Sequence, residues 1–174
     1  LASFIFNNSD YLKLRYKNQL FIQINTKEKR EVFYQENVYF KLYRSGIEVF
    51  KNYPTFGVGN KNYRIETCDG NKNNKNYYCQ THPHQVYIEF LAEHGLLGTS
   101  VFLILIFYLI FKNFKIYLNS QNFIQLGSFI YLLTNFLPLL PSGSFFSDFN
   151  LTLFWINLSI MHACNKKTNF FQKK

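Results

Sequence analysis

The segment between residues 96 and 111 constrains the fold more than any other part of the chain. Its sequence, LLGTSVFLILIFYLIF, contains no charged residue. A bilayer core of ~30 Å requires ~20 helical residues, although ~17 still suffice, and this segment reaches that length if its helix begins within 93–95. Hydrophobic residues make up 48% of the chain, yet the mean hydropathy is only -0.12, so the apolar residues are concentrated in stretches. We therefore predict a transmembrane helix over residues 96–111.

Two further apolar stretches, at 123–141 and 145–164, predict transmembrane helices over residues 123–141 and 148–164. The first contains the polar residues Gln125 and Asn135 together with Pro138, and the second contains Asp148, Asn157 and His162. Polar groups at membrane depth are costly unless they face protein or a wet cavity. The buried helical core of a soluble protein is therefore the competing interpretation of these two segments.

The distribution of lysines among the loops predicts the orientation. Lysines follow the first and third apolar segments, at Lys112, Lys115, Lys166, Lys167, Lys173 and Lys174. The turn at 142–147 has no Lys or Arg. The positive-inside rule then places residues 112–122 and 165–174 in the cytoplasm, and the turn and residues 7–95 outside. The apolar start LASFIF, residues 1–6, is expected to end an earlier membrane helix, unless it is a mature N-terminus left by processing.

The formal net charge of +9 does not indicate a nucleic-acid partner. Residues 1–95 contain 13 basic and 9 acidic residues, whereas the remainder contains 6 basic and 1 acidic. Most basic residues of the second part flank the apolar segments, where they serve as topology anchors. Without a dense basic stripe or a recognition motif, we predict no nucleic-acid binding.

The outer part contains a predicted helix and a glycine turn. Apolar residues at helical spacing predict a helix over roughly 31–52, with Arg44 off its apolar face. Pro54 ends this pattern, and the sequence FGVGN at 56–60 follows. Its glycines indicate a tight turn that the backbone of a neighbour or ligand can approach. The turn is not a phosphate loop, because the required lysine and serine and the preceding strand are absent.

The sequence THPHQ, residues 81–85, precedes a predicted helix that runs into the first apolar segment. Proline suits the first turn of a helix, so Thr81 or His82 is the expected cap and His84 a first-turn residue. Free N–H groups there favour an anion, and an imidazole beside them can accept a proton near neutral pH. The competing interpretation is a capped helix start with no chemical role.

The predicted helix is amphipathic, so it could lie along the membrane surface before the first span. One face carries Gln85, Glu89 and Glu93, which we expect water to solvate, and another carries Tyr87, Leu91 and His94. His82 and His84 as metal ligands would need partners that the sequence does not supply, so we predict no metal site. Cys68 and Cys79 lie in the outer part, where an oxidising compartment permits a disulfide; two free thiols are the alternative.

In their order, these motifs resemble the C-terminal half of the O-antigen ligase and polymerase family of bacterial inner-membrane glycosyltransferases. The resemblance covers about residues 38–160. It is most specific in PTFGVG at 54–59 and HPHQVYIEFLAEHGLLG at 82–98. The family usually has Asn after the second histidine, where this chain has Gln85, so the amide is retained on a longer side chain.

The resemblance implies an all-α membrane protein, part of a multi-span GT-C-like fold with a mostly helical periplasmic loop domain. It implies transfer of a glycan from undecaprenyl diphosphate without a metal or other cofactor. The acceptor is lipid A-core in ligases and a second lipid-linked repeat in polymerases, and membrane lipids are further partners. A fragment of such a protein is expected to be inactive alone. A non-catalytic membrane protein that binds the same lipid-linked glycan is the alternative from another class.

The resemblance also implies roles for single residues. Arg44 matches the key loop arginine of the family, and His84 matches its key histidine. Arg64 is carried over as a second diphosphate ligand, and His82 and Gln85 are expected to bind substrate. The chemistry of the residues agrees, because an imidazole can remove the proton of an acceptor hydroxyl and a guanidinium fork suits a leaving diphosphate.

Overall fold

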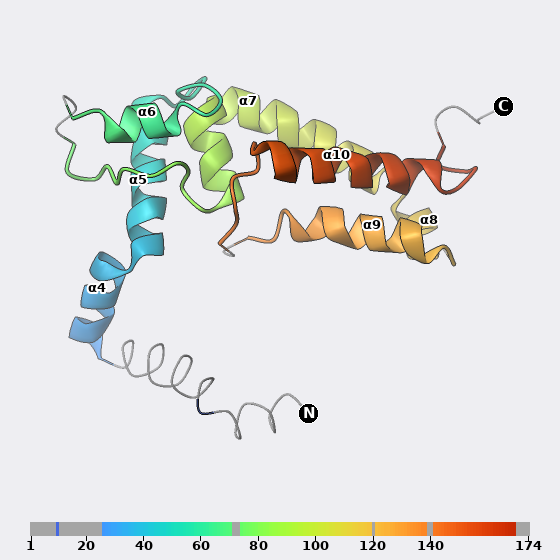
Figure 1. The fold of residues 1–174 in the computed structure, drawn as a ribbon, viewed down its shortest axis with the longest axis horizontal. Coiled ribbons are helices and arrows are strands. Elements are labelled where there is room, and N and C mark those ends of the chain that lie inside the picture. The colour runs from blue at the N-terminus through green and yellow to red at the C-terminus, as the bar shows by residue number, and fades with distance from the viewer. Residues whose placement is uncertain (1–9, 11–25, 71–73, 120, 139–140, 170–174) are drawn as a thin grey trace. The chain divides into compact units, whose positions relative to one another are not determined.

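The computed structural model describes residue 10 and residues 26–70, 74–119, 121–138 and 141–169. All regular structure in these residues is helical (Figure 1), as expected for an all-α protein. The chain divides into two compact units, residues 1–41 and 42–174. The predicted end of an earlier span at residues 1–6 lies outside the described residues.

The predicted single helix over 31–52 is two helices, α4 (Lys27–Glu36) and α5 (Val38–Asn52). Asn37 separates them, because its ψ of 126° is extended. Its N–H donates to the carbonyl of Phe33 at 2.9 Å, and its side-chain oxygen accepts from the N–H of Tyr39 at 3.0 Å. The Asn side chain thus competes with the helix ladder, as short polar side chains commonly do.

In the second unit, α5 packs with α6 (Tyr63–Cys68). The buried hydroxyl of Tyr63 donates to Ser45 Oγ at 2.8 Å, and Ser45 Oγ also accepts from the N–H of Tyr78 at 3.0 Å. Val49, Tyr63 and Ala92 form a small apolar core. Burial raises the pKa of Tyr63 to about 12, so its hydroxyl remains a hydrogen-bond donor.

Helix α7 (Val86–Phe111) has 26 residues and is long and apolar enough to cross a membrane. A kink at Gly95, with φ 63° and ψ -169°, interrupts its hydrogen-bond ladder. The N–H groups of Leu96 and Leu97 therefore miss the carbonyls four residues earlier. They donate instead to the carbonyls of Pro54 at 2.8 Å and Thr55 at 3.2 Å, in the turn that follows α5.

The kink also leaves two carbonyls of α7 without their helical N–H partners, and the turn after α5 binds both of them. The carbonyl of Ala92 accepts from the N–H of Val58 at 3.0 Å, and that of Glu93 accepts from the N–H of Gly59 at 2.8 Å. All four exchanged backbone groups thus have partners, as buried backbone groups require. Residues 54–59 take the place of one turn of helix ladder, so the two most specific motifs of the sequence form one structural unit.

This unit requires glycine at two positions. A Cβ on Gly57 would overlap the backbone of Glu93, and a Cβ on Gly95 would overlap the backbone of Thr55. Both glycines also have positive φ, 68° and 63°, which residues with side chains rarely adopt. The predicted close approach of the glycine turn to a neighbour is therefore an approach to α7.

In the described residues after α7 there are three shorter helices: α8 (Phe114–Leu118), α9 (Phe123–Thr134) and α10 (Asp148–Ala163). The predicted helix over 148–164 agrees with α10, which Ser147 caps by accepting from the N–H of Asn150 at 3.3 Å. The predicted helix over 123–141 is too long, because α9 ends at Thr134. At 12 and 16 residues, α9 and α10 extend for about 18 and 24 Å.

Helices α9 and α10 lie side by side (Figure 1), and aromatic rings fill the core between them and α7. Phe145 has edge-to-face contacts with Phe90, at 5.0 Å between ring centroids, and with Phe154 at 5.1 Å. Phe136 contacts Phe154 at 5.9 Å. Such pairs stabilise a core beyond the area they bury.

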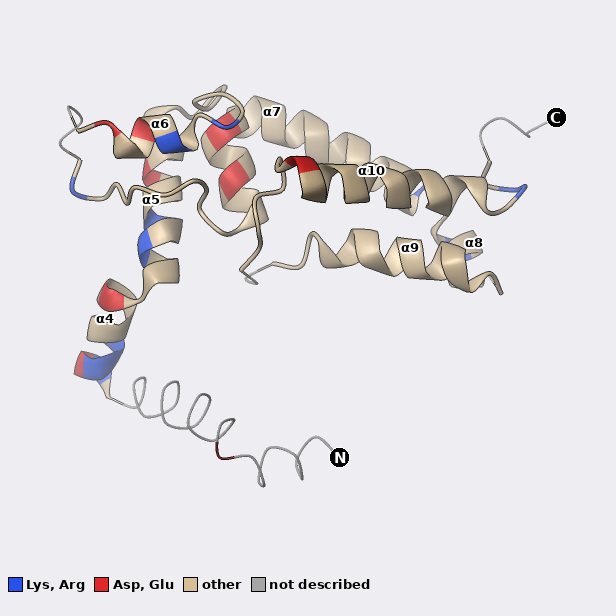
Figure 2. Ribbon diagram, in the orientation of Figure 1, with Lys and Arg blue, Asp and Glu red and all other residues tan. Residues whose placement is uncertain are grey.

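The loops of this bundle fall into two groups. At one end, Ser142 N–H donates to the carbonyl of His84 at 2.9 Å. At the other, Asn122 Nδ2 donates to the carbonyl of Cys164 at 3.3 Å. Lys and Arg are found near α8 and after α10, whereas α9, α10 after its first residue, and the second half of α7 carry neither Lys, Arg, Asp nor Glu (Figure 2).

Candidate active site

The helix after THPHQ begins later than predicted. Val86 is the first residue of α7, and Gln85, not Thr81 or His82, is its N-cap. Gln85 Oε1 accepts from the N–H of Ile88 at 2.8 Å. The prediction that Pro83 and His84 lie in the first turn is therefore wrong. His84 has φ 56°, in the left-handed region, so the chain turns there before the helix starts.

This later start changes the expected role of Gln85. Its side chain is buried and serves the helix as a cap, in the position where Asn would be a preferred capping residue. The N–H groups predicted to bind an anion at 81–84 lie ahead of the helix, and the first-turn N–H groups belong to Val86, Tyr87 and Ile88 instead. The amide retained at position 85 thus has a structural explanation.

His82 and His84 contact each other at the start of α7, with ring centroids 4.0 Å apart. His82 Nδ1 lies 2.9 Å from Thr81 Oγ1. Burial, and secondarily the neighbouring His84, lower the pKa of His82, while the backbone of Ser142 opposes this shift. A lowered pKa keeps the His82 imidazole neutral near pH 7, in the form that accepts a proton.

Arg44 lies on the exposed side of α5. Two residues later on α5, Gly46 packs on Pro83, and a Cβ at Gly46 would approach the Pro83 ring to 3.0 Å. The helix that carries Arg44 therefore touches the residue between the two histidines. Among the described residues, Arg44 has no hydrogen bond or ion pair, and no bond joins it to His84.

Arg64 lies on α6 and is also exposed. The structure joins Cys68, at the end of α6, to Cys79 by a disulfide with 4.6 Å between the Cα atoms. Tyr77, close to the bridge, donates its hydroxyl to Glu66 at 2.9 Å and accepts from Asn52 Nδ2 at 2.9 Å. Bridge and hydrogen bonds tie the segment before THPHQ to α5 and α6, within the part of the chain that the structure describes.

The polar face of α7 is buried, contrary to the prediction that water solvates it. Glu89 and Glu93 are both almost completely inaccessible. Glu89 Oε1 accepts from the hydroxyl of Ser144 at 2.5 Å, and Glu89 Oε2 accepts from the N–H of Phe145 at 2.9 Å. The turn between α9 and α10 thus covers this face, and nothing in the local sequence of α7 indicates that cover.

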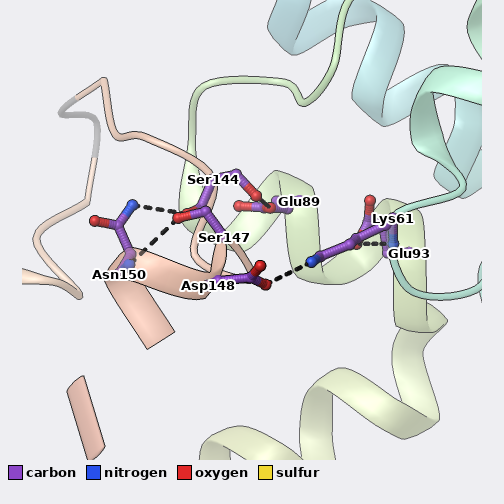
Figure 3. A network of polar contacts seen from close by, with 7 residues as sticks. All are labelled: Lys61, Glu89, Glu93, Ser144, Ser147, Asp148 and Asn150. Atoms are coloured by element: carbon purple, nitrogen blue, oxygen red, sulfur yellow. Dashed lines mark hydrogen bonds and ion pairs between the residues drawn. The ribbon is translucent and has the colours of Figure 1, made fainter. Parts of the chain in front are cut away.

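Glu93 binds a second segment. Its Oε2 accepts from the N–H of Lys61 at 3.0 Å, and Lys61 Nζ contacts Asp148 Oδ1 at 2.9 Å at the start of α10. The two glutamates therefore connect α7 with two different loops (Figure 3). Burial raises the pKa of Glu93 and raises that of Glu89 to about 7; hydrogen bonds partly oppose both shifts.

A pocket of about 230 Å³ opens beside the start of α7. Its lining includes Val86 and hydroxyl, amide and aromatic side chains of the α9–α10 region, among them Tyr131, Thr134, Asn135, Ser142 and Asn150. Ser142 also donates its N–H to the carbonyl of His84, so the pocket adjoins the His84 backbone. Its mixture of hydroxyl, amide and aromatic groups suits a polar ligand with apolar faces. Among the described residues, no group of three His, Cys, Asp or Glu residues could hold a metal ion.

Comparison with known proteins identifies the family. The sequence profile described as O-antigen ligase matches residues 14–103, just over half of the 174-residue chain. The matched part includes Arg44, Arg64 and His84, and it begins and ends earlier than the resemblance over 38–160. No curated protein and no solved structure matches the chain. The predicted resemblance is confirmed: the chain belongs to the O-antigen ligase family.

Proposed function

We propose that this protein is a glycosyltransferase that moves a glycan from undecaprenyl diphosphate to a hydroxyl of lipid A-core or a similar acceptor. The family gives the general class, a membrane-associated enzyme of the O-antigen ligase or polymerase type. The proposal adds the donor, the acceptor and the location: the inner membrane, with residues 7–95 and the turn at 142–147 on the periplasmic side and residues 112–122 and 165–174 in the cytoplasm. Spans at 123–141 and 148–164, and further spans of a GT-C-like fold, belong to the same proposal.

One observation carries the proposal: two imidazoles in contact lie at the start of the helix that enters the apolar segment, and the helix bearing Arg44 packs on the proline between them. An imidazole there can take the proton of an acceptor hydroxyl. The adjoining pocket offers room for a sugar beside the His84 backbone. The segments at 84 and 142 are hydrogen-bonded to each other, and so are those at 122 and 164, which agrees with placing each pair on one side of the membrane.

In the proposed reaction, His84 removes the proton from the acceptor hydroxyl as its oxygen attacks the anomeric carbon. The bond from that carbon to the diphosphate breaks with inversion, and the diphosphate leaves with its electron pair. Arg44 and Arg64, both exposed, supply fixed positive charge for the leaving group. His82 and Gln85 are assigned to substrate binding, His82 directly and Gln85 through the helix start that it caps.

The test compares Arg44→Ala with Lys51→Ala in the full-length protein, because both remove an exposed cation from α5. We expect Arg44→Ala to lower glycan transfer about 100-fold or more, the typical loss on removing one charge-stabilising donor. Lys51→Ala, whose side chain lies 3.9 Å from Glu48, should stay within about twofold of wild type. Carrier binding is measured in parallel with a labelled lipid-linked glycan.

The outcomes separate the function classes. Lost turnover with retained carrier binding supports the enzyme. Unchanged turnover by the Arg44 variant contradicts its proposed role, and binding without any turnover by the wild-type protein favours a non-catalytic lipid-glycan-binding protein. Formation of longer lipid-linked glycans, in place of transfer to lipid A-core, identifies a polymerase.

A further inference from the structure

The turn between α9 and α10 is attached to the start of α7 by several hydrogen bonds (Figure 3 shows the bond between Glu89 and Ser144). Ser142 N–H donates to the carbonyl of His84 at 2.9 Å. The hydroxyl of Ser144 and the N–H of Phe145 bind the two carboxyl oxygens of Glu89 at 2.5 and 2.9 Å. The Glu89 carboxyl group thus binds Ser144 and Phe145, which are consecutive. Ser142, the first residue of the same segment 142–145, binds the carbonyl of His84.

The backbone at His84 needs such support. With φ 56°, His84 is in the left-handed region, which residues with side chains rarely adopt and which persists only where the surroundings impose it. On the helix side, Gln85 caps α7. On the other side, the bond to His84 comes from Ser142. The backbone conformation at His84 is therefore supported by Gln85 and the helix on one side and by residues 142–145 on the other.

Burying a carboxyl group without hydrogen bonds would be unfavourable. The Ser144 hydroxyl and the Phe145 N–H both donate hydrogen bonds to the Glu89 carboxyl group, and the backbone of Phe146 contacts it as well. Three other charged groups belong to this network (Figure 3): Glu93 on α7, Lys61 in the loop between α5 and α6, and Asp148 on α10. None of these three has a hydrogen bond to Glu89 in the described residues. Asn150 Nδ2 holds the carbonyl of Ser144 at 2.8 Å from the side of α10, whereas Glu89 supplies the side-chain hydrogen bonds that join Ser144 and Phe145 to α7.

We propose that Glu89 is a positioning residue for the transfer reaction: it holds residues 142–145 against the start of α7 and so fixes the orientation of His84. This inference rests on the proposed function, because it assigns to His84 the role of proton acceptor. Glu89 touches neither donor nor acceptor in this account, and it acts through the backbone bond from Ser142 to His84.

The experiment uses the full-length protein with Glu89→Ala, Glu89→Gln and the control Gln125→Ala. Gln125 is an equally buried polar residue at the other end of the bundle, where its Nε2 donates to the carbonyl of Met161 at 2.7 Å and to Thr168 Oγ1 at 3.1 Å. We measure the amount of protein in the membrane and, per molecule, kcat and KM for the lipid-linked donor. A misplaced catalytic group can lower kcat about 100-fold.

We expect Glu89→Ala to lower kcat roughly 10- to 100-fold with little change in KM. Glu89→Gln should restore most of this loss, because an amide can accept from Phe145 N–H and donate to Ser144 Oγ. Gln125→Ala should lower only the amount of folded protein. Wild-type kcat in Glu89→Ala, equal loss in the Ala and Gln variants, or an equal loss of kcat in Gln125→Ala would each overturn the inference.

A double-variant cycle distinguishes failure of this inference from failure of the proposed function. If His84→Ala alone leaves transfer normal, the proposed function is wrong. If His84→Ala reduces transfer, the double variant with Glu89→Ala should be less than threefold slower than His84→Ala alone. Both changes would abolish proton removal by His84, so their effects should not multiply. A full multiplicative loss in the double variant would mean that Glu89 acts independently of His84, which contradicts the inference alone.

Discussion

Before its kink at Gly95, helix α7 buries charged residues, and after the kink it exposes apolar ones. Glu89 and Glu93 are 1% and 2% exposed, whereas Val101 and Ile104 are 68% and 70% exposed. The first half is enclosed by loops of the protein that supply hydrogen bonds. The second half exposes a large apolar face. Because the family is membrane-associated, this face is suited to contact with lipid. One helix thus combines a buried polar half with an exposed apolar half, and the glycine turn at 54–59 binds α7 at the boundary between them.

Of these changes, Gly95→Leu should reduce the amount of folded protein most, because Gly95 lies at the kink where residues 54–59 contact α7. The side chain would overlap the backbone of Thr55 and would force a residue with a Cβ to φ 63°. Backbone strain alone costs about 1–3 kcal/mol, and the overlap adds to it. We expect a severe loss of folded protein in the membrane. Gly127→Ala on α9, where a Cβ would meet nothing within 4 Å, is the control and should be tolerated. Equal yields of the two variants would contradict the close backbone contact between residues 54–59 and α7.

Two equally exposed isoleucines distinguish a surface in water from a surface in lipid. Ile65 on α6 and Ile104 in the second half of α7 are 71% and 70% exposed. Arginine at 104 should reduce membrane insertion by about 2.5–3.5 kcal/mol, the cost at the centre of a transmembrane helix. Arginine at 65 should change stability by no more than about 0.5 kcal/mol, as at an ordinary wet surface. Insertion is measured by glycosylation-site mapping, and equal tolerance of both changes would show that residue 104 does not face lipid.

The buried half of α7 predicts a pH dependence of stability. Burial raises the pKa of Glu89 from 4.5 to about 7, so between these values the folded protein binds more protons than the unfolded chain. The stability contributed by protonated Glu89 is complete below about pH 4.5 and is lost as the pH rises to about 7. The expected loss is on the order of 1–3 kcal/mol. Glu89→Gln should remove this slope in thermal unfolding of detergent-solubilised protein; an unchanged slope would contradict the burial of Glu89.

The apolar half of α7 was readily predicted, and the polar half was not. A long uncharged apolar run predicts a helix from its own residues alone, and residues 96–111 do lie within α7. For Glu89 and Glu93, helical spacing correctly grouped them on one face. What covers that face is the turn near Ser144, 55 positions later in the chain, and spacing within a helix contains no information about so distant a partner.

The helix start shows a second kind of limit. Proline at a first turn is a sound local expectation, but His84 in the left-handed region delays the start of α7 to Val86. The contact of Pro83 with Gly46 and the bond from Ser142 to His84 impose that conformation from outside the segment. Tertiary contacts here override local preference, at the residue to which the resemblance assigns the chemistry. Strained backbone at such a position is typical of functional sites.

The role of His84 is tested by glycan transfer in the His84→Ala variant of the full-length protein, with His82→Ala as the matched control because the two rings contact each other. At equal amounts of membrane protein and saturating donor, we predict that His84→Ala lowers the transfer rate about 100- to 10,000-fold, the usual contribution of a general base. His82→Ala should lower it by much less. A normal transfer rate in His84→Ala, or a larger loss in His82→Ala, would contradict the assignment of His84 as the proton acceptor at the entrance to α7.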